Sequence, residues 1–134
     1  MCGMADINLR VVDIYHNDNV TSFQQAADSG LWGIIHKATT GATGTDPEYA
    51  NRRKPALDAG LLWGAYHWGT NADVSAQVKN FLDTAKPDES TLVALDFEET
   101  AGNQMTIDQA RQFLTSVAAA PKKKARTPGS KRGQ

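Results

Sequence analysis

Four short apolar runs recur along the chain, and each is followed by a stretch with a helical pattern. The runs are Leu9 to Ile14, Leu31 to Ile35, Leu61 to Tyr66 and Leu92 to Phe97. Their length and apolar character are typical of strands that are buried in a sheet. Strands that alternate with helices form βα units, and such units build a parallel sheet with right-handed crossovers. The sequence therefore predicts an α/β domain whose reactive side chains lie at the carboxyl ends of the strands.

The last helical segment carries both a start signal and an apolar stripe. Thr106-Ile107-Asp108-Gln109 forms a capping box, in which a threonine and a glutamine three residues later satisfy each other's backbone amides. A helical spacing then places four apolar residues on one face, namely Ile107, Ala110, Leu114 and Val117. We expect this face to be the inner one, packed against the sheet.

Acidic, basic and aromatic side chains lie at the carboxyl ends of the predicted strands. In chain order they are Asp13 at the first strand, His36 and Lys37 at the second, Tyr66, His67 and Trp68 at the third, and Asp96 and Glu98 at the fourth. Because the carboxyl ends of parallel strands meet at one edge, we expect these side chains to share one mouth. Tyr and Trp rings stack on the apolar faces of sugars, so the set fits a carbohydrate ligand.

Asp96 and Glu98 form the most informative pair in the chain. Side chains two positions apart on a strand point the same way, and their backbones are roughly 6.6 Å apart. Repulsion between the two charges should raise the pKa of one carboxyl group while the other stays ionised. A glycosidase needs such an arrangement, with a proton donor beside a charge that stabilises the transition state.

Five motifs in this order resemble glycoside hydrolase family 25, the lysozymes of the N-acetylmuramidase type. They are Val12-Asp13-Ile14-Tyr15-His16-Asn17, the run from Gly33 to Gly41, Asp46-Pro47, Gly64-Ala65-Tyr66-His67-Trp68 and Ala94-Leu95-Asp96-Phe97-Glu98. The resemblance extends from Arg10 to about Val117. It implies hydrolysis of the β-1,4 link between N-acetylmuramic acid and N-acetylglucosamine in peptidoglycan, without a cofactor or a metal.

The resemblance also implies roles for individual residues. Glu98 would be the general acid that protonates the departing glycosidic oxygen. Asp96 would stabilise the oxocarbenium-like state or orient the 2-acetamido group of the substrate, which can itself act as nucleophile. Asp13 would support both from the floor of the pocket. Four further residues would bind the saccharide, namely Tyr66, His67, Trp68 and Lys37.

The length of the chain limits how much of the family's barrel it can form. A TIM-type barrel of eight βα units takes about 250 residues, whereas this chain has 134. We therefore expect a parallel (β/α) barrel truncated to about its first four or five βα units, within residues 9–120 and preceded by a flexible N-terminus at 1–8. Such a sheet has unpaired edges, which a second copy or a complementary chain could complete.

Two alternatives remain open at the level of the sequence. His16, His36 and His67 lie near three predicted strand ends and, with Asp13 or Asp96, could form a zinc or iron site. The same mouth could also bind a glycan without cleaving it, as a peptidoglycan-binding module or a truncated remnant. Loss of activity with a chelator would favour the metal reading, whereas the family reading predicts no effect.

Charge is distributed unevenly between the body and the C-terminal end. Residues 121–134 hold six of the fourteen basic residues and no acid, so the rest of the chain carries eight basic and fifteen acidic residues. This basic end has no apolar anchor and is expected to be disordered. It lacks the interleaved aromatics of a nucleic-acid module, so nucleic acid is not an expected partner. The sequence shows neither a secretory signal nor a membrane-spanning run, and it does not indicate a location.

Overall fold

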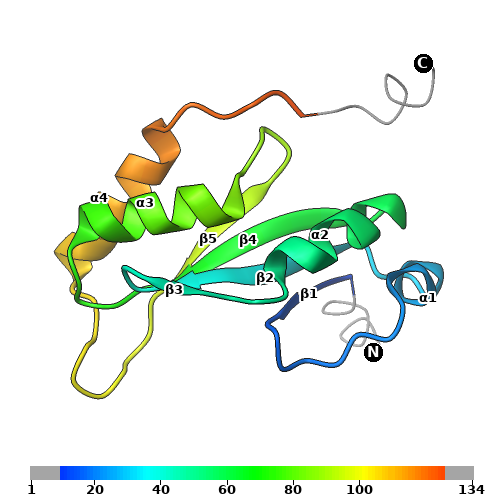
Figure 1. Ribbon diagram of the computed structural model, residues 1–134, viewed down its shortest axis with the longest axis horizontal. Helices are drawn as coiled ribbons and strands as arrows, with labels where there is room; N and C mark the ends of the chain where they lie inside the picture. The colour runs from blue at the N-terminus through cyan, green and yellow to red at the C-terminus, as the bar shows by residue number, and fades with distance from the viewer. Residues whose placement is uncertain (1–9, 126–134) are drawn as a thin grey trace, which may run out of the picture.

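Strands and helices alternate along the chain as the sequence predicts (Figure 1). The computed structural model describes residues 10–125. Its elements are β1 (Val11–Ile14), α1 (Phe23–Asp28), β2 (Gly33–Thr40), β3 (Gly44–Thr45), α2 (Tyr49–Asp58), β4 (Leu62–Trp68), α3 (Val74–Ala85), β5 (Leu92–Asp96) and α4 (Ile107–Ala119). The two-residue β3 has no counterpart among the predicted strands.

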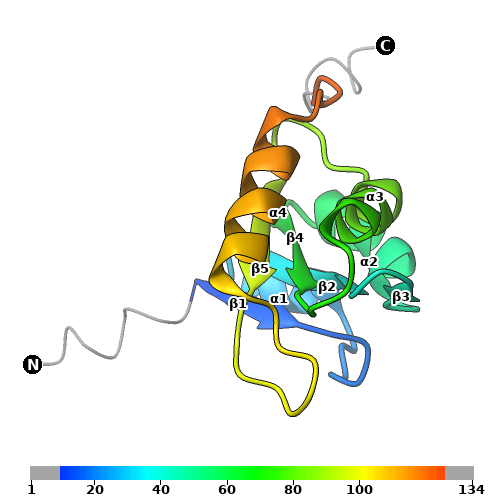
Figure 2. The same cartoon turned by 90° about the vertical axis from the view of Figure 1, so that its left-hand side faces the viewer.

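The four longer strands form one parallel sheet in the order β1-β2-β4-β5, and β3 pairs antiparallel with β2. This confirms an α/β fold with a parallel sheet. β1 and β5 are the two edge strands, and they do not pair with each other. The sheet formed by the described residues is therefore open, and viewed from its end it is curled, with the helices outside it (Figure 2).

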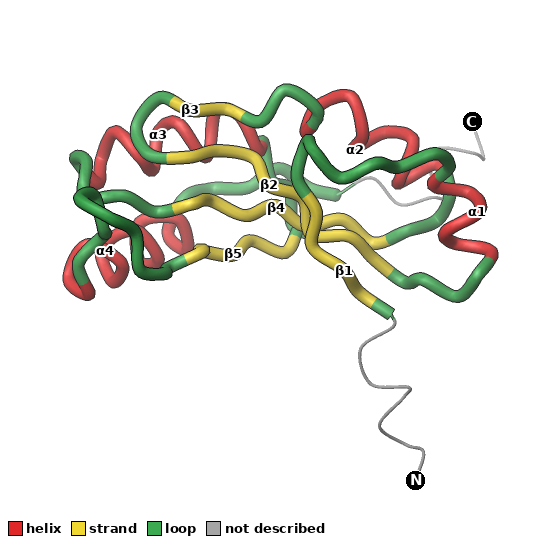
Figure 3. Tube along the Cα trace, turned by 90° about the horizontal axis from the view of Figure 1, so that it is seen from below, coloured by secondary structure: helices red, strands yellow, loops and turns green. Residues whose placement is uncertain are grey.

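The helices cover one face of the sheet, and the other face is bare. Along β2 and β4, the side chains of Ile34, His36 and Trp63 are buried on the helix side. Seen from below, no helix lies in front of the strands (Figure 3). Val11, Leu62 and Leu92 are 48%, 66% and 55% exposed. The alternation of side chains along each strand places all three on the bare face.

The helix α4 begins with the predicted capping box but presents a different face to the sheet. Thr106 Oγ1 accepts from the Gln109 amide at 3.1 Å, and the Gln109 side chain accepts from the Thr106 amide at 3.0 Å. The buried residues are Ala110, Phe113 and Val117. The expectation that Ile107 and Leu114 face inward is wrong, because they are 60% and 49% exposed. The described residues place no strand beyond β5 that these two side chains could cover.

The start of the basic C-terminal end lies beside the loop before β5. The carbonyl oxygen of Lys123 accepts from the Glu89 amide at 3.0 Å, and Asp88 forms a parallel bridge with Lys123. Residues 126–134 and 1–9 lie outside the described part of the chain, so the expectations for residues 1–8 and for most of 121–134 fall there. Among residues 10–125, no helix has the length and apolar composition needed to cross a bilayer.

Candidate active site

Two central strands run further than the sequence suggests, and this decides where their polar side chains point. β2 continues to Thr40 and β4 to Trp68. Lys37 and Trp68 therefore lie within strands instead of following them, and Tyr66 lies within β4 as predicted. Because side chains alternate between faces, all three lie on the bare face, where Lys37 and Tyr66 are in register.

A cavity of about 400 Å³ opens on this bare face toward the carboxyl ends of the strands. Its lining comes from all four parallel strands and the residues that follow β5, namely Asp13, Ile35, Tyr66, Ala94, Leu95, Asp96 and Glu98. The structure thus brings together Asp13, Tyr66, Asp96 and Glu98 from segments up to 85 residues apart in the sequence. Ile35 and Ala94 also line the cavity, although sequence reasoning did not single them out.

The electrostatics of the cavity centre on Asp96. Burial raises its pKa to about 6, and a hydrogen bond with Glu98 and the negative charges of Glu98 and Asp13 act in the same direction. The Lys37 ammonium partly offsets this rise in the pKa of Asp96. Asp96 therefore stays partly protonated at a pH where ordinary carboxyl groups are ionised.

The raised pKa predicts a specific dependence of stability on pH. Between about pH 4 and pH 6, Asp96 holds a proton in the folded chain that it releases in the unfolded chain. The contribution of Asp96 to the free energy of unfolding therefore falls as pH rises through that window. Asp96→Asn removes the effect. We expect the variant to be more stable than the parent at pH 8, with a smaller gain at pH 4. Urea unfolding of the parent and the variant at pH 4 and pH 8 measures the difference in their free energies of unfolding. The same difference at both pH values would contradict the prediction.

Tyr66 stays protonated at the wall of the cavity. Its pKa is raised to about 12, first by burial and then by the negative charges of Asp96 and Asp13. Its phenol can therefore donate a hydrogen bond to a ligand oxygen throughout the neutral range. Lys37 and Trp68 lie beside the cavity on the same face, with the Lys37 ammonium 5.3 Å from the centre of the Trp68 ring.

His67 does not reach the site, and its predicted contact with saccharide is wrong for this structure. The strand alternation turns it to the helix side, where its side chain is fully buried. Nδ1 lies 2.6 Å from Thr39 Oγ1, and Nε2 lies 2.9 Å from Gln77 Oε1. Burial lowers the pKa of His67, which favours a neutral ring that holds the core together.

The three histidines considered as metal ligands lie in different environments. His36 is buried, its Nδ1 is 2.8 Å from the Lys37 carbonyl oxygen, and its Nε2 is 3.1 Å from the Arg52 guanidinium. His16 Nδ1 is 3.1 Å from the Asp46 carboxylate. Across residues 10–125, no three side chains of metal-binding type come together. The proposed zinc or iron site is therefore not assembled from these residues.

Asp46 is a structural part of the site's surroundings, and the sequence analysis named it only as part of the Asp46-Pro47 motif. Its buried carboxylate accepts from the amides of His16 and Glu48 at 2.9 and 2.8 Å. These hydrogen bonds keep the pKa of Asp46 low although burial acts to raise it. Asp46 thereby ties the loop after β1, which follows Asp13, to the start of α2. The Asp-Pro pair was the available signal for this residue.

The chain is similar to known lysozymes and muramidases. It is 31% identical over 102 residues to an autolytic lysozyme from Clostridium acetobutylicum. Among solved structures it is similar to a bacterial lysozyme from Streptomyces coelicolor, with a TM-score of 0.67 and 25% identity over 80% of this chain. It is also similar to a muramidase from Trichobolus zukalii, with a TM-score of 0.67 and 26% identity over 78% of this chain.

The matches cover only a part of these relatives. The chain spans 31% of the Clostridium protein, 54% of the Streptomyces chain and 55% of the Trichobolus chain. A model of the glycosyl hydrolases of family 25 nevertheless matches residues 12–127, which include the whole cavity. On the strength of that match and of the shared fold, this chain belongs to glycosyl hydrolase family 25.

Proposed function

We propose that this chain is a muramidase that hydrolyses the β-1,4 link between N-acetylmuramic acid and N-acetylglucosamine in peptidoglycan. The observation that carries the proposal is the hydrogen-bonded carboxyl pair Asp96 and Glu98, in which the pKa of Asp96 is raised to about 6, in a cavity that Asp13 and Tyr66 also line. Family membership and the lysozyme relatives support the same reaction.

In the proposed reaction, the proton held in the hydrogen bond between Asp96 and Glu98 passes through Glu98 to the glycosidic oxygen as the bond to the sugar's anomeric carbon breaks, which leaves Asp96 ionised. Glu98 is exposed and Asp96 is half-buried, so Glu98 is the member of the pair that can meet the leaving group. Asp96 then stabilises the positive charge on the sugar, or orients the 2-acetamido group as it attacks the anomeric carbon. Water completes the cleavage, and Glu98 recovers its proton from that water.

Two residues would hold the glycan while the proton moves, and a third would balance the charge of the carboxylates. The Tyr66 phenol would donate to a sugar oxygen, and the Trp68 ring would stack on an apolar sugar face. Lys37, which lies over the Trp68 ring, would limit the ionic repulsion among Asp13, Asp96 and Glu98. We further propose that the open sheet corresponds to the first four βα units of a (β/α) barrel of TIM type.

Release of new reducing ends from purified peptidoglycan tests the proposal against the binding-only alternative. The alternative is favoured by one observation, that the chain spans just over half of each solved relative quoted above. A muramidase releases reducing ends, and EDTA does not reduce the rate. Sedimentation of the chain with insoluble peptidoglycan, without release of reducing ends, would instead identify a binding module and overturn the catalytic proposal.

A further inference from the structure

The bare face of the sheet has an apolar floor below the polar cavity. Val11, Leu62 and Leu92 lie at the amino-terminal ends of β1, β4 and β5, and each is at least 48% exposed. In closed barrels of parallel strands, layers of such branched side chains fill the interior. The floor is therefore suited to packing against an equivalent set of side chains.

Both edges of the sheet are also available for pairing. β1 pairs only with β2 and β5 pairs only with β4, so each edge strand leaves one side of its backbone without a strand partner among the described residues. The two edges belong to the same parallel sheet. A strand added in parallel beside β5 would therefore have the orientation of β1.

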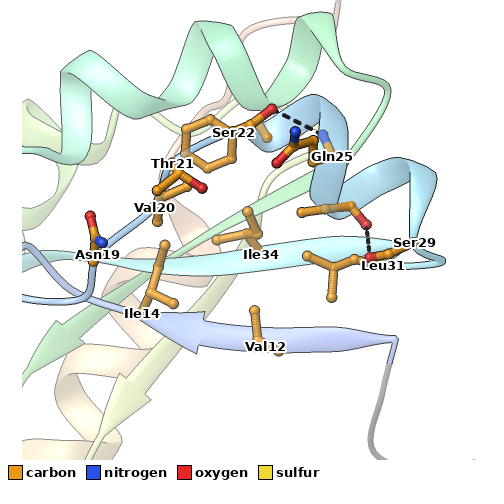
Figure 4. Close-up of a pocket in the computed structure, with 12 residues that line it drawn as sticks. Val12, Ile14, Asn19, Val20, Thr21, Ser22, Gln25, Ser29, Leu31 and Ile34 are labelled. Carbon is orange, nitrogen blue, oxygen red and sulfur yellow. Dashed lines mark hydrogen bonds between the residues drawn. The ribbon is translucent and has the colours of Figure 1, made fainter.

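A groove of about 400 Å³ lies on the helix side of the β1 edge, between that strand and α1. Val12 and Ile14 point from β1 into this groove, and Leu31 and Ile34 line it from the neighbouring segment (Figure 4). Val12 is 37% exposed although it lies on the face that helices cover elsewhere in the sheet. In βα folds this position, outside an edge strand and beside its helix, is where the helix of an adjacent unit packs.

The opposite edge carries a helix with an unused apolar stripe. On α4, Ile107 and Leu114 are seven residues apart and so lie on one side of the helix, next to the buried stripe of Ala110, Phe113 and Val117. The groove between α3 and α4 is lined instead by Val74 and Ser75 of α3 and by Arg111, Gln112, Thr115 and Ser116 of α4. The stripe of Ile107 and Leu114 thus lies on the side of α4 away from α3. A strand added beside β5 would extend the sheet beneath this side of α4.

We propose that two copies of this chain associate about a two-fold axis, with β5 of each copy beside β1 of the other. The stripe of Ile107 and Leu114 then packs in the partner's groove between α1 and β1, and the two bare sheet faces enclose a common interior of eight parallel strands. Both halves of the contact are present on one chain, at opposite edges of its sheet. A second copy therefore occupies both edges and both grooves at once, as a closed two-fold arrangement requires.

Sedimentation velocity across a concentration series, in the absence of glycan, tests the association. The chain should shift from its monomer mass of 14.5 kDa to twice that value as concentration rises. Val12→Lys and Leu114→Glu should each weaken the dimer about a hundredfold or more, because every dimer buries the unpaired charge at two places. Leu57→Glu is the matched control, since Leu57 on α2 is 46% exposed and lies outside both surfaces.

The double variant Val12→Lys with Leu114→Glu identifies the pairing itself. Opposite charges then meet at both contacts, so the dimer should regain at least about tenfold in affinity over either single variant. A chain that stays monomeric at every concentration would overturn the proposal. Single variants that dimerise as tightly as the parent chain would also overturn it. So would a double variant whose dimer is no tighter than that of either single variant.

Hydrogen exchange of the parent chain gives a test that does not depend on how the variants fold. Amides of β1 and β5 that face away from β2 and β4 should gain protection as concentration rises, together with those of the residues around the groove. Protection that is independent of concentration would contradict the dimer. None of these measurements involves hydrolysis, so their outcome is independent of the proposed muramidase activity.

Discussion

Replacing Glu98 by Gln should lower the rate of reducing-end release by about a hundredfold or more, the range expected for removing a general acid. The amide keeps the shape of the side chain but cannot protonate the glycosidic oxygen. A hundredfold loss corresponds to about 2.7 kcal/mol in the barrier. The same substitution removes a negative charge that helps to raise the pKa of Asp96. The pKa of Asp96, followed by NMR, should therefore fall below about 6.

Glu99→Gln is the matched control for this experiment. Glu99 is exposed, directly follows Glu98 in sequence and does not line the cavity. Its variant should release reducing ends at the parental rate. Equal losses in the two variants would indicate a general effect of charge on binding to the wall. A fall in the pKa of Asp96 without a loss of rate would place the proton donor elsewhere, even though the pair is assembled as described.

The alternation of strands and helices was predictable because it depends on local patterns. Short apolar runs, separated by caps and glycines, identify βα units without knowledge of their neighbours. The convergence of Asp13, Tyr66, Asp96 and Glu98 follows from the same pattern, since parallel strands bring their carboxyl ends together. The sequence therefore predicted both the sheet and the four acidic and aromatic residues that line its cavity.

The direction of individual side chains was less predictable, because it depends on where each strand ends. A polar residue after a strand is free to turn toward the mouth, but within a strand its face is fixed. β4 extends through His67 to Trp68, and His67 is therefore held beneath α3 and α4 while Tyr66 faces the cavity. The apolar run alone gave no sign of this extension, since His67 and Trp68 are compatible with either a strand or a loop.

The inner face of α4 was also ambiguous from the sequence. The helix has two neighbouring apolar stripes, one with Ala110, Phe113 and Val117 and one with Ile107 and Leu114. Helical periodicity alone accepts either stripe or a combination. The choice depends on tertiary neighbours, because Phe113 meets His67 and Phe81 whereas no described strand lies beyond β5 to cover Leu114.

Phe113→Ala should lower the free energy of unfolding by about 3 to 5 kcal/mol, the range for removing a buried aromatic ring. Phe113 is 1% exposed, and its ring stacks on His67 with a centroid distance of 4.7 Å and an interplanar angle of 15°. Phe81 lies 5.8 Å away across the same cluster. The space left by the deleted Phe113 ring would therefore expose the buried hydrogen bonds of His67 to Thr39 and Gln77. Domains of this size are stable by only about 5 to 15 kcal/mol, so the loss is a large share of the total.

Urea unfolding followed by far-UV circular dichroism measures this effect, with Gln112→Ala as the control. Gln112 is the preceding residue on α4 and is exposed, so its variant should differ from the parent by no more than about 0.5 kcal/mol. A loss of less than about 1 kcal/mol for Phe113→Ala would mean that α4 is not packed over His67 as described. Because α4 also carries the stripe proposed to contact a second copy, this variant should weaken the dimer as well as the fold, whereas Leu114→Glu should weaken the dimer alone.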